Sequence, residues 1–400
     1  MNLHILRSSF QTDTFVENEY ADLIQRLKKE CQAEITIVGD ETPSPQKASE
    51  VVMIATGGVE NLFKRVWSGK PTTLIADGRN NSLAAALEIL TWLESQHVEG
   101  RILHGTNSDI ITSLVEMQAT TLQGLRIGLF GQPSDWLIAS GVDRDYLRDH
   151  FGVETIDIDL QRLIDGIKSV PPTEAVKVAQ SIVKRSSNTV EPSCTDMVEA
   201  AKAYLAIKAI CKEERLDAMA IRCFDIVKSC GTTSCLALAL LNDEGIVAGC
   251  EGDMQTLMSM LLVRRLCGAE AFMANPSNLT DHSAMLAHCT IPLRMCDDII
   301  LRSHFESSIG VAIQGTLPLT DYTLFKWGGP RLDRYFVTEA HAVETPYSNH
   351  FCRTQITLNT DLRPYLLKHA IGNHHVIIKG KHAQTIKDFM SEHTIAQEAK

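Results

Sequence analysis

Apolar segments of strand length alternate with helical segments along the first part of the chain. Residues 51–55 form a continuous apolar run that ends in Thr56-Gly57-Gly58, and residues 72–76 form another. Residues 15–29 and 83–93 instead place apolar side chains at helical spacing. Apolar strands without period-two polarity are typical of a parallel sheet that helices cover on both faces. This pattern predicts a doubly wound α/β domain over residues 1–121.

The alternation resumes near residue 122 and changes again near residue 299. Runs at 125–130, 218–221 and 246–250 predict a second parallel sheet within residues 122–298. After residue 300, short runs such as 309–314 follow at strand-like spacing, with Gly or Pro between most of them, which is typical of antiparallel β-structure. We therefore expect two doubly wound parallel-sheet α/β domains, followed by a C-terminal domain (299–400) with an antiparallel β-barrel. The pattern leaves open whether the barrel begins near residue 255 or near residue 300.

The composition limits the class of partner. The 400 residues carry 49 acidic and 38 basic side chains, a net charge of −11. Such a chain repels a phosphate backbone, so no nucleic-acid partner is expected. No apolar stretch reaches the about 18 residues of a membrane helix, and the N-terminus shows no apolar signal core. These features predict a cytoplasmic protein without a membrane partner. The odd number of cysteines, eleven, does not suggest a disulfide framework.

Two carboxylates follow the apolar run at 246–250, in the segment Cys250-Glu251-Gly252-Asp253. Asp253 is a good N-cap for the helix expected after it. Alternatively, Glu251 and Asp253 face one cation, because residues i and i+2 point the same way on an extended chain. A hard divalent ion binds such carboxylate oxygens. The sequence alone leaves both interpretations open.

Adjacent histidines occupy the start of a C-terminal strand, in Gly372-Asn373-His374-His375. Neighbouring residues of a strand point to opposite faces, so at most one of the two should ligate a given ion. Imidazole combined with carboxylate suits Mn²⁺ or a similar ion. The alternative is one packed and one solvated imidazole.

Three further side chains are candidates for chemistry. Asp225 follows the strand expected at 218–221. It could act as a base, or it could simply start a turn or cap the next helix. His288, beside Cys289, and Arg353 are candidate substrate contacts. His288 could equally belong to a buried structural pair, and Arg353 could pair with the excess carboxylates.

The motifs in this order resemble the L-fucose isomerase-like group of ketol isomerases, especially its shorter relatives. The resemblance covers most of the chain from Leu122 onward, and it rests on the following segments. They are Arg126-Ile-Gly-Leu-Phe-Gly-Gln-Pro-Ser-Asp-Trp136, Cys250-Glu-Gly-Asp253, His288-Cys-Thr-Ile-Pro292, Phe351-Cys-Arg-Thr354 and Gly372-Asn-His-His375.

The resemblance implies a metal-dependent aldose–ketose isomerase that moves a proton between C1 and C2 of a free monosaccharide through an enediol. It implies Mn²⁺ or a similar ion held by Asp253 and His374, and a homo-oligomer, trimeric or hexameric. The family's catalytic glutamate has no counterpart, because the helix expected at 235–241 contains no acid. Glu251 or Asp225 would then act as the base. Alternatives are a non-catalytic sugar-binding protein and a different metal-assisted lyase or hydrolase.

Overall fold

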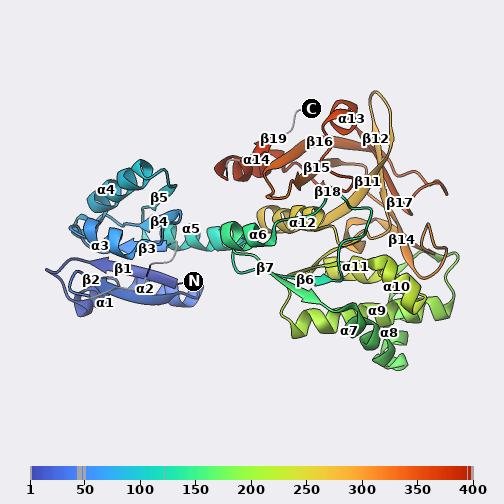
Figure 1. Ribbon diagram of the computed structural model, residues 1–400, viewed down its shortest axis with the longest axis horizontal. Helices are drawn as coiled ribbons and strands as arrows, with labels where there is room; N and C mark the ends of the chain where they lie inside the picture. Colours follow the sequence, from blue (N-terminus) through green and yellow to red (C-terminus); the bar gives the residue numbers. More distant parts are fainter. Residues whose placement is uncertain (1, 43–46, 48–50, 121, 394, 398–400) are drawn as a thin grey trace. The chain divides into compact units, whose positions relative to one another are not determined.

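The computed structural model describes residues 2–42, 47, 51–120, 122–393 and 395–397. The chain divides into two compact units, Met1–Thr121 and Leu122–Lys400 (Figure 1). Among the described residues, no helix combines the length and the apolar character needed to cross a bilayer.

The first unit is a doubly wound parallel sheet, as its sequence predicts. The sheet has the order β2-β1-β3-β4-β5, and all its pairings are parallel. One face packs on α1, α2 and α5, and the other packs on α3 and α4. The strands are β1 (Asn2–Arg7), β2 (Glu34–Gly39), β3 (Val51–Ile54), β4 (Thr72–Ile75) and β5 (Gly100–Leu103). The helices are α1 (Asp13–Glu19), α2 (Ala21–Glu30), α3 (Glu60–Val66), α4 (Ser82–Ser95) and α5 (Asn107–Thr120), with a 3₁₀ turn at Arg79–Asn81.

The second unit begins with another parallel sheet, of order β10-β9-β6-β7. Its strands are β6 (Arg126–Phe130), β7 (Glu154–Ile158), β9 (Ala218–Ile221) and β10 (Val247–Gly249). The helices of this part are α6 (Arg144–Phe151), α7 (Leu160–Ser169), α8 (Pro172–Arg185), α9 (Cys194–Glu213), α10 (Cys223–Cys230), α11 (Cys235–Asp243) and α12 (Met254–Cys267). Parallel strands bring their carboxyl ends to one edge, so the turn after β10 lies at the ligand-facing edge of this sheet.

A closed antiparallel barrel of six strands follows, which confirms the predicted fold class. The order is β15-β18-β11-β12-β17-β16, and pairing of β16 with β15 closes it. The strands are β11 (Ala271–Leu279), β12 (Ala284–His288), β15 (Asp321–Gly328), β16 (Arg334–Glu344), β17 (Thr354–Asn359) and β18 (His375–Lys379). The short strand β19 (Ala396–Gln397) pairs with β16, and α13 (Arg363–Lys368) and α14 (Ala383–Glu392) complete the C-terminal part.

The barrel starts at Ala271, between the two starting points that the sequence leaves open, so two of its strands precede residue 299. The apolar run at 309–314 does not enter the barrel. Its last three residues, 312–314, begin strand β14 (Ala312–Thr316). This strand pairs with β13 (Asp298–Arg302) in a separate sheet that also contains β8 (Asn188–Thr189). A 3₁₀ turn at Leu293–Met295 precedes β13. Strand spacing identifies β-structure but does not say which sheet a strand joins.

Helix α12 connects the two sheets of the second unit. Its residues from Met254 to Val263 are all buried, although several are polar. The helix packs on β9 and β10 of the parallel sheet and on β11, β15 and β18 of the barrel (Figure 1). The N-terminus of α12 therefore lies where the edge of the parallel sheet meets barrel strands from much later in the sequence.

Candidate metal centre

The turn between β10 and α12 carries the two predicted carboxylates. Glu251 and Gly252 both have left-handed backbone conformations, with φ of 60° and 72°. Glycine suits the second position, because a Cβ atom there would lie 2.7 Å from the Cα atom of Pro133. The chain is therefore sharply turned rather than extended, and the expectation that Glu251 and Asp253 point the same way is wrong.

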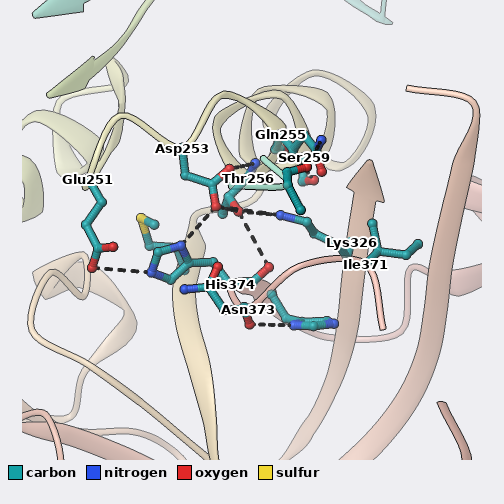
Figure 2. A network of polar contacts seen from close by, with 12 residues as sticks. Glu251, Asp253, Gln255, Thr256, Ser259, Lys326, Ile371, Asn373 and His374 are labelled. Atoms are coloured by element: carbon teal, nitrogen blue, oxygen red, sulfur yellow. Dashed lines mark hydrogen bonds and ion pairs between the residues drawn. The ribbon is translucent and has the colours of Figure 1, made fainter. Parts of the chain in front are cut away.

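The two carboxylates instead approach opposite sides of one imidazole, that of His374 (Figure 2). Oδ2 of Asp253 lies 2.9 Å from Nδ1 of His374, and Oε1 of Glu251 lies 3.6 Å from Nε2. His374 is completely buried, and its Nε2 atom has no hydrogen-bond partner among the residues that the structure describes. A buried nitrogen left unpaired beside a carboxylate fits a metal-ligating role.

Asp253 caps helix α12. Its Oδ1 accepts a hydrogen bond from the backbone N–H of Thr256 at 2.9 Å, and Oδ2 accepts from the Thr256 hydroxyl at 2.7 Å. Nζ of the fully buried Lys326 lies 3.8 Å from Oδ2 and donates to the Thr256 hydroxyl at 2.6 Å. Both carboxylate oxygens thus contact protein groups, and Oδ2 also lies against Nδ1 of His374, so Asp253 is placed to orient that ring. Its predicted role as a metal ligand stays a prediction.

His288, at the end of β12, completes the cluster. Its ring centre lies 5.4 Å from that of His374, and its Nδ1 lies 2.9 Å from the Thr290 hydroxyl. Glu251, His288 and His374 each offer one ligand atom, and these atoms lie within 4.8 Å of one another. Two imidazoles and one carboxylate are donor types that divalent transition-metal ions bind. The sequence proposed His288 as a substrate contact, whereas the geometry groups it with the possible ligands.

The histidines and carboxylates of the site shift one another's pKa values. Burial disfavours ionisation of Glu251, but His374 and His288 together hold its pKa at about 2. Burial likewise opposes the charged form of His374, but Asp253 and Glu251 raise its pKa to about 9. Burial, with His374 nearby, lowers the pKa of His288 to about 3. These pKa values leave Glu251 ionised, His374 protonated and His288 neutral near pH 7 in the metal-free protein.

The remaining predicted residues lie outside this three-residue cluster. Asp225 pairs with Arg222 at 3.0 Å and lines a cavity of about 570 Å³ with Gly131 and Asp157. Arg353 is buried and donates to Ser303 O at 2.8 Å, to the Ser303 hydroxyl at 3.2 Å and to the Tyr347 hydroxyl at 3.0 Å. Its guanidinium therefore supports the segment after β13.

The neighbouring histidine faces another environment. His375 Nε2 lies 2.9 Å from the Tyr365 hydroxyl, and Nδ1 lies 3.0 Å from the Asn373 carbonyl oxygen. Of the adjacent pair, the structure brings only His374 to the carboxylates.

Two residues of the site were not proposed as functional from the sequence. Trp136 donates its indole N–H to Oε2 of Glu251 at 2.6 Å. Lys326 is fully buried, with its Nζ atom 3.8 Å from Oδ2 of Asp253. Trp136 is part of the first segment of the resemblance, and Lys326 lies between Phe325 and Trp327 in a strand. A lysine flanked by large apolar residues is the one signal that could have indicated a buried cation.

No protein-family model matches the chain. Curated proteins named sulfoquinovose isomerase are similar to it. The protein from Alkalicoccus urumqiensis is 24% identical over 279 residues, which is 67% of this chain and 62% of that protein. The protein from Priestia megaterium is 24% identical over 262 residues, 62% of this chain and 58% of that protein. The chain thus spans about three fifths of the length of the curated relatives it matches.

Proposed function

We propose that the protein is a metal-dependent aldose–ketose isomerase that acts on a free monosaccharide through an enediol. The observation that carries the proposal is the convergence of Glu251, His288 and His374, with Nε2 of His374 buried and unpaired. The similarity to proteins named sulfoquinovose isomerase supports the same reaction class and makes sulfoquinovose the first substrate to test.

The cluster residues would hold Mn²⁺ or a similar ion. When bound, such an ion supplies Lewis-acid stabilisation of the negative charge that develops on an enediolate. On metal binding, His374 would give up the proton on Nε2, and Asp253 would keep the remaining proton on Nδ1, because a carboxylate only accepts hydrogen bonds. The lone pair of Nε2, which faces Glu251, would then be available to the ion.

Proton transfer between C1 and C2 needs a base beside the substrate. Glu251 and Asp225 are the two candidates, and geometry favours Glu251. Its pKa is lowered to about 2, so its carboxylate is ionised, and its Oε1 lies 3.6 Å from Nε2 of His374. Asp225 instead pairs with Arg222, which also binds Asp135. A positioned base of this kind contributes about 10² to 10⁴ in rate.

Solvent-deuterium incorporation tests the proposal. The full-length protein, loaded with Mn²⁺, is incubated with sulfoquinovose in D₂O, and recovered sugars are analysed by mass spectrometry after chelation of the metal. An isomerase that works through an enediol forms the ketose and incorporates up to one deuterium per turnover at the carbon that is reprotonated, as the abstracted proton exchanges with solvent. Sugar binding with neither ketose product nor incorporation would instead identify a binding protein, and cleavage products without incorporation would identify a lyase or hydrolase.

A further inference from the structure

The loop between β6 and α6, residues 131–143, lies over the turn that carries Glu251. It is longer than the about 2 to 6 residues of most strand–helix connections. The Ser134 N–H donates to the Glu251 carbonyl oxygen at 2.8 Å. The side-chain amide of Gln255, in α12, donates to the carbonyl oxygens of Ala139 at 2.9 Å and Gly141 at 3.0 Å. The loop is therefore fastened to both sides of the Glu251–Asp253 turn.

Arg222 adds contacts to the first part of the loop, around Ser134. It donates to the Pro133 carbonyl oxygen at 2.8 Å and to both Asp135 carboxylate oxygens, at 3.1 and 2.7 Å. Asp225 accepts from the same guanidinium at 3.0 Å. Such a forked guanidinium–carboxylate contact fixes orientation as well as distance. Together with the hydrogen bonds from Gln255 to Ala139 and Gly141, the contacts of Arg222 fix the loop on both sides of Trp136.

Trp136 makes two contacts that define its position. Its indole N–H donates to Glu251 Oε2 at 2.6 Å, while Oε1 of the same carboxylate faces His374. Its ring meets Phe224 edge-on, with centres 5.1 Å apart. The residue nevertheless keeps 52% of its surface exposed. A large aromatic ring is thus held beside the cluster of Glu251, His288 and His374, with much of its surface exposed to solvent.

We infer that Trp136 has two roles: its N–H positions Glu251 for metal binding, and its open face forms the apolar wall of the sugar subsite. This inference rests on the proposed function. An indole N–H can only donate, so it occupies Oε2 without competing for the ion. Carbohydrate C–H groups pack against aromatic faces, and ligand sites combine such walls with a few fixed polar groups.

Two substitutions separate the roles. W136F keeps an aromatic face but removes the N–H, whereas W136A removes both. Ile138→Ala is the matched control, because Ile138 lies on the same loop and is 93% exposed. For each full-length variant, the Mn²⁺ dissociation constant is measured by calorimetry, and KM for sulfoquinovose is measured at saturating Mn²⁺.

We expect W136F to weaken Mn²⁺ binding about 10- to 100-fold, as loss of a group that orients a metal ligand does. Its KM at saturating Mn²⁺ should stay within about threefold of the wild type, whereas W136A should raise KM about tenfold, which corresponds to about 1.4 kcal/mol. I138A should change neither quantity. Wild-type Mn²⁺ affinity in W136F, or wild-type KM in W136A, would overturn the corresponding role.

The proposed function is judged separately, on the wild-type protein. If that protein binds Mn²⁺ and incorporates deuterium while the Trp136 variants behave normally, only the inference fails. If the wild-type protein binds no Mn²⁺, the proposed function and the inference fail together.

Discussion

Asp253 Oδ2 lies 2.9 Å from Nδ1 of His374, although 121 positions separate the two residues in the sequence. A helix N-cap thereby also orients an imidazole from the start of a barrel strand. Carboxylate–histidine pairs of this kind set which ring nitrogen is free for a metal and raise its basicity. The packing of α12 between the parallel sheet and the barrel creates this contact.

Removing the charge of Asp253 should weaken metal binding without removing the helix cap. Asn is also a good N-cap, so Asp253→Asn should preserve α12. We expect about a 10- to 100-fold loss of Mn²⁺ affinity, measured by calorimetry. Asp253→Ala should in addition lose about 0.5–2 kcal/mol of unfolding free energy, because the cap disappears. Unchanged affinity in D253N would contradict the orienting role, and complete loss would indicate that Asp253 is itself a ligand.

Lys326 should be important for stability. It is fully buried 3.8 Å from the equally buried Asp253, and its substitution leaves a buried carboxylate with less compensation. We expect Lys326→Met to lower the free energy of unfolding by about 3–5 kcal/mol, measured by urea titration. The double variant K326M/D253N should recover part of that loss, because it removes both charges. Strict additivity of the two single effects would show that the residues are not coupled.

Substitution at the two candidate bases should have unequal effects. Glu251→Gln should slow deuterium incorporation at saturating Mn²⁺ by about 10² or more, since it removes the proposed base. Asp225→Asn should change the rate by less than about tenfold, because Asp225 only supports Arg222 beneath the loop. The opposite ranking would transfer the role of base to Asp225.

The stability of the segment after β13 should depend on pH through Glu191. Hydrogen bonds from Arg302, helped by the Ser303 N–H, hold the pKa of Glu191 below its usual value of 4.5, although burial opposes this. The lowered pKa means that Glu191 stabilises the folded state above pH 4.5, and that this contribution disappears as pH falls through the folded-state pKa.

Urea unfolding at pH 6 and pH 3.5 measures this contribution. Glu191→Gln should be less stable than the wild type at pH 6, and the difference should be smaller at pH 3.5. Glu174→Gln, at an exposed position on α8, is the control and should follow the wild type at both pH values. An equal loss at both pH values would show that ionisation of Glu191 is not responsible.

The fold class could be predicted because its signals are local. Apolar runs without alternation mark the two parallel sheets, and short runs punctuated by Gly or Pro mark the β-rich C-terminal region. A barrel was expected, but its starting point and its strand membership could not be predicted, since two of its strands, at 271–279 and 284–288, look like part of the preceding domain.

The site was predictable to the level of residue type and neighbourhood. Strand-end logic identified the carboxylates at 251 and 253, and the family resemblance selected His374 from the adjacent histidines. The structure brings all three residues together. A non-glycine residue with positive φ is uncommon, so the left-handed turn at Glu251 had no sequence signal. That turn is what sends the two carboxylates to opposite sides of His374. Lys326 was missed because its environment arises only from tertiary packing.

The central claim is that Glu251, His288 and His374 together bind one divalent ion. Titration of the metal-free protein with Mn²⁺, followed by electron paramagnetic resonance, measures this directly in the wild type and in His374→Ala. We predict one tightly bound Mn²⁺ per wild-type chain and a loss of at least about 100-fold in affinity for H374A. No stoichiometric Mn²⁺ in the wild type, or equal affinity in H374A, would contradict the account.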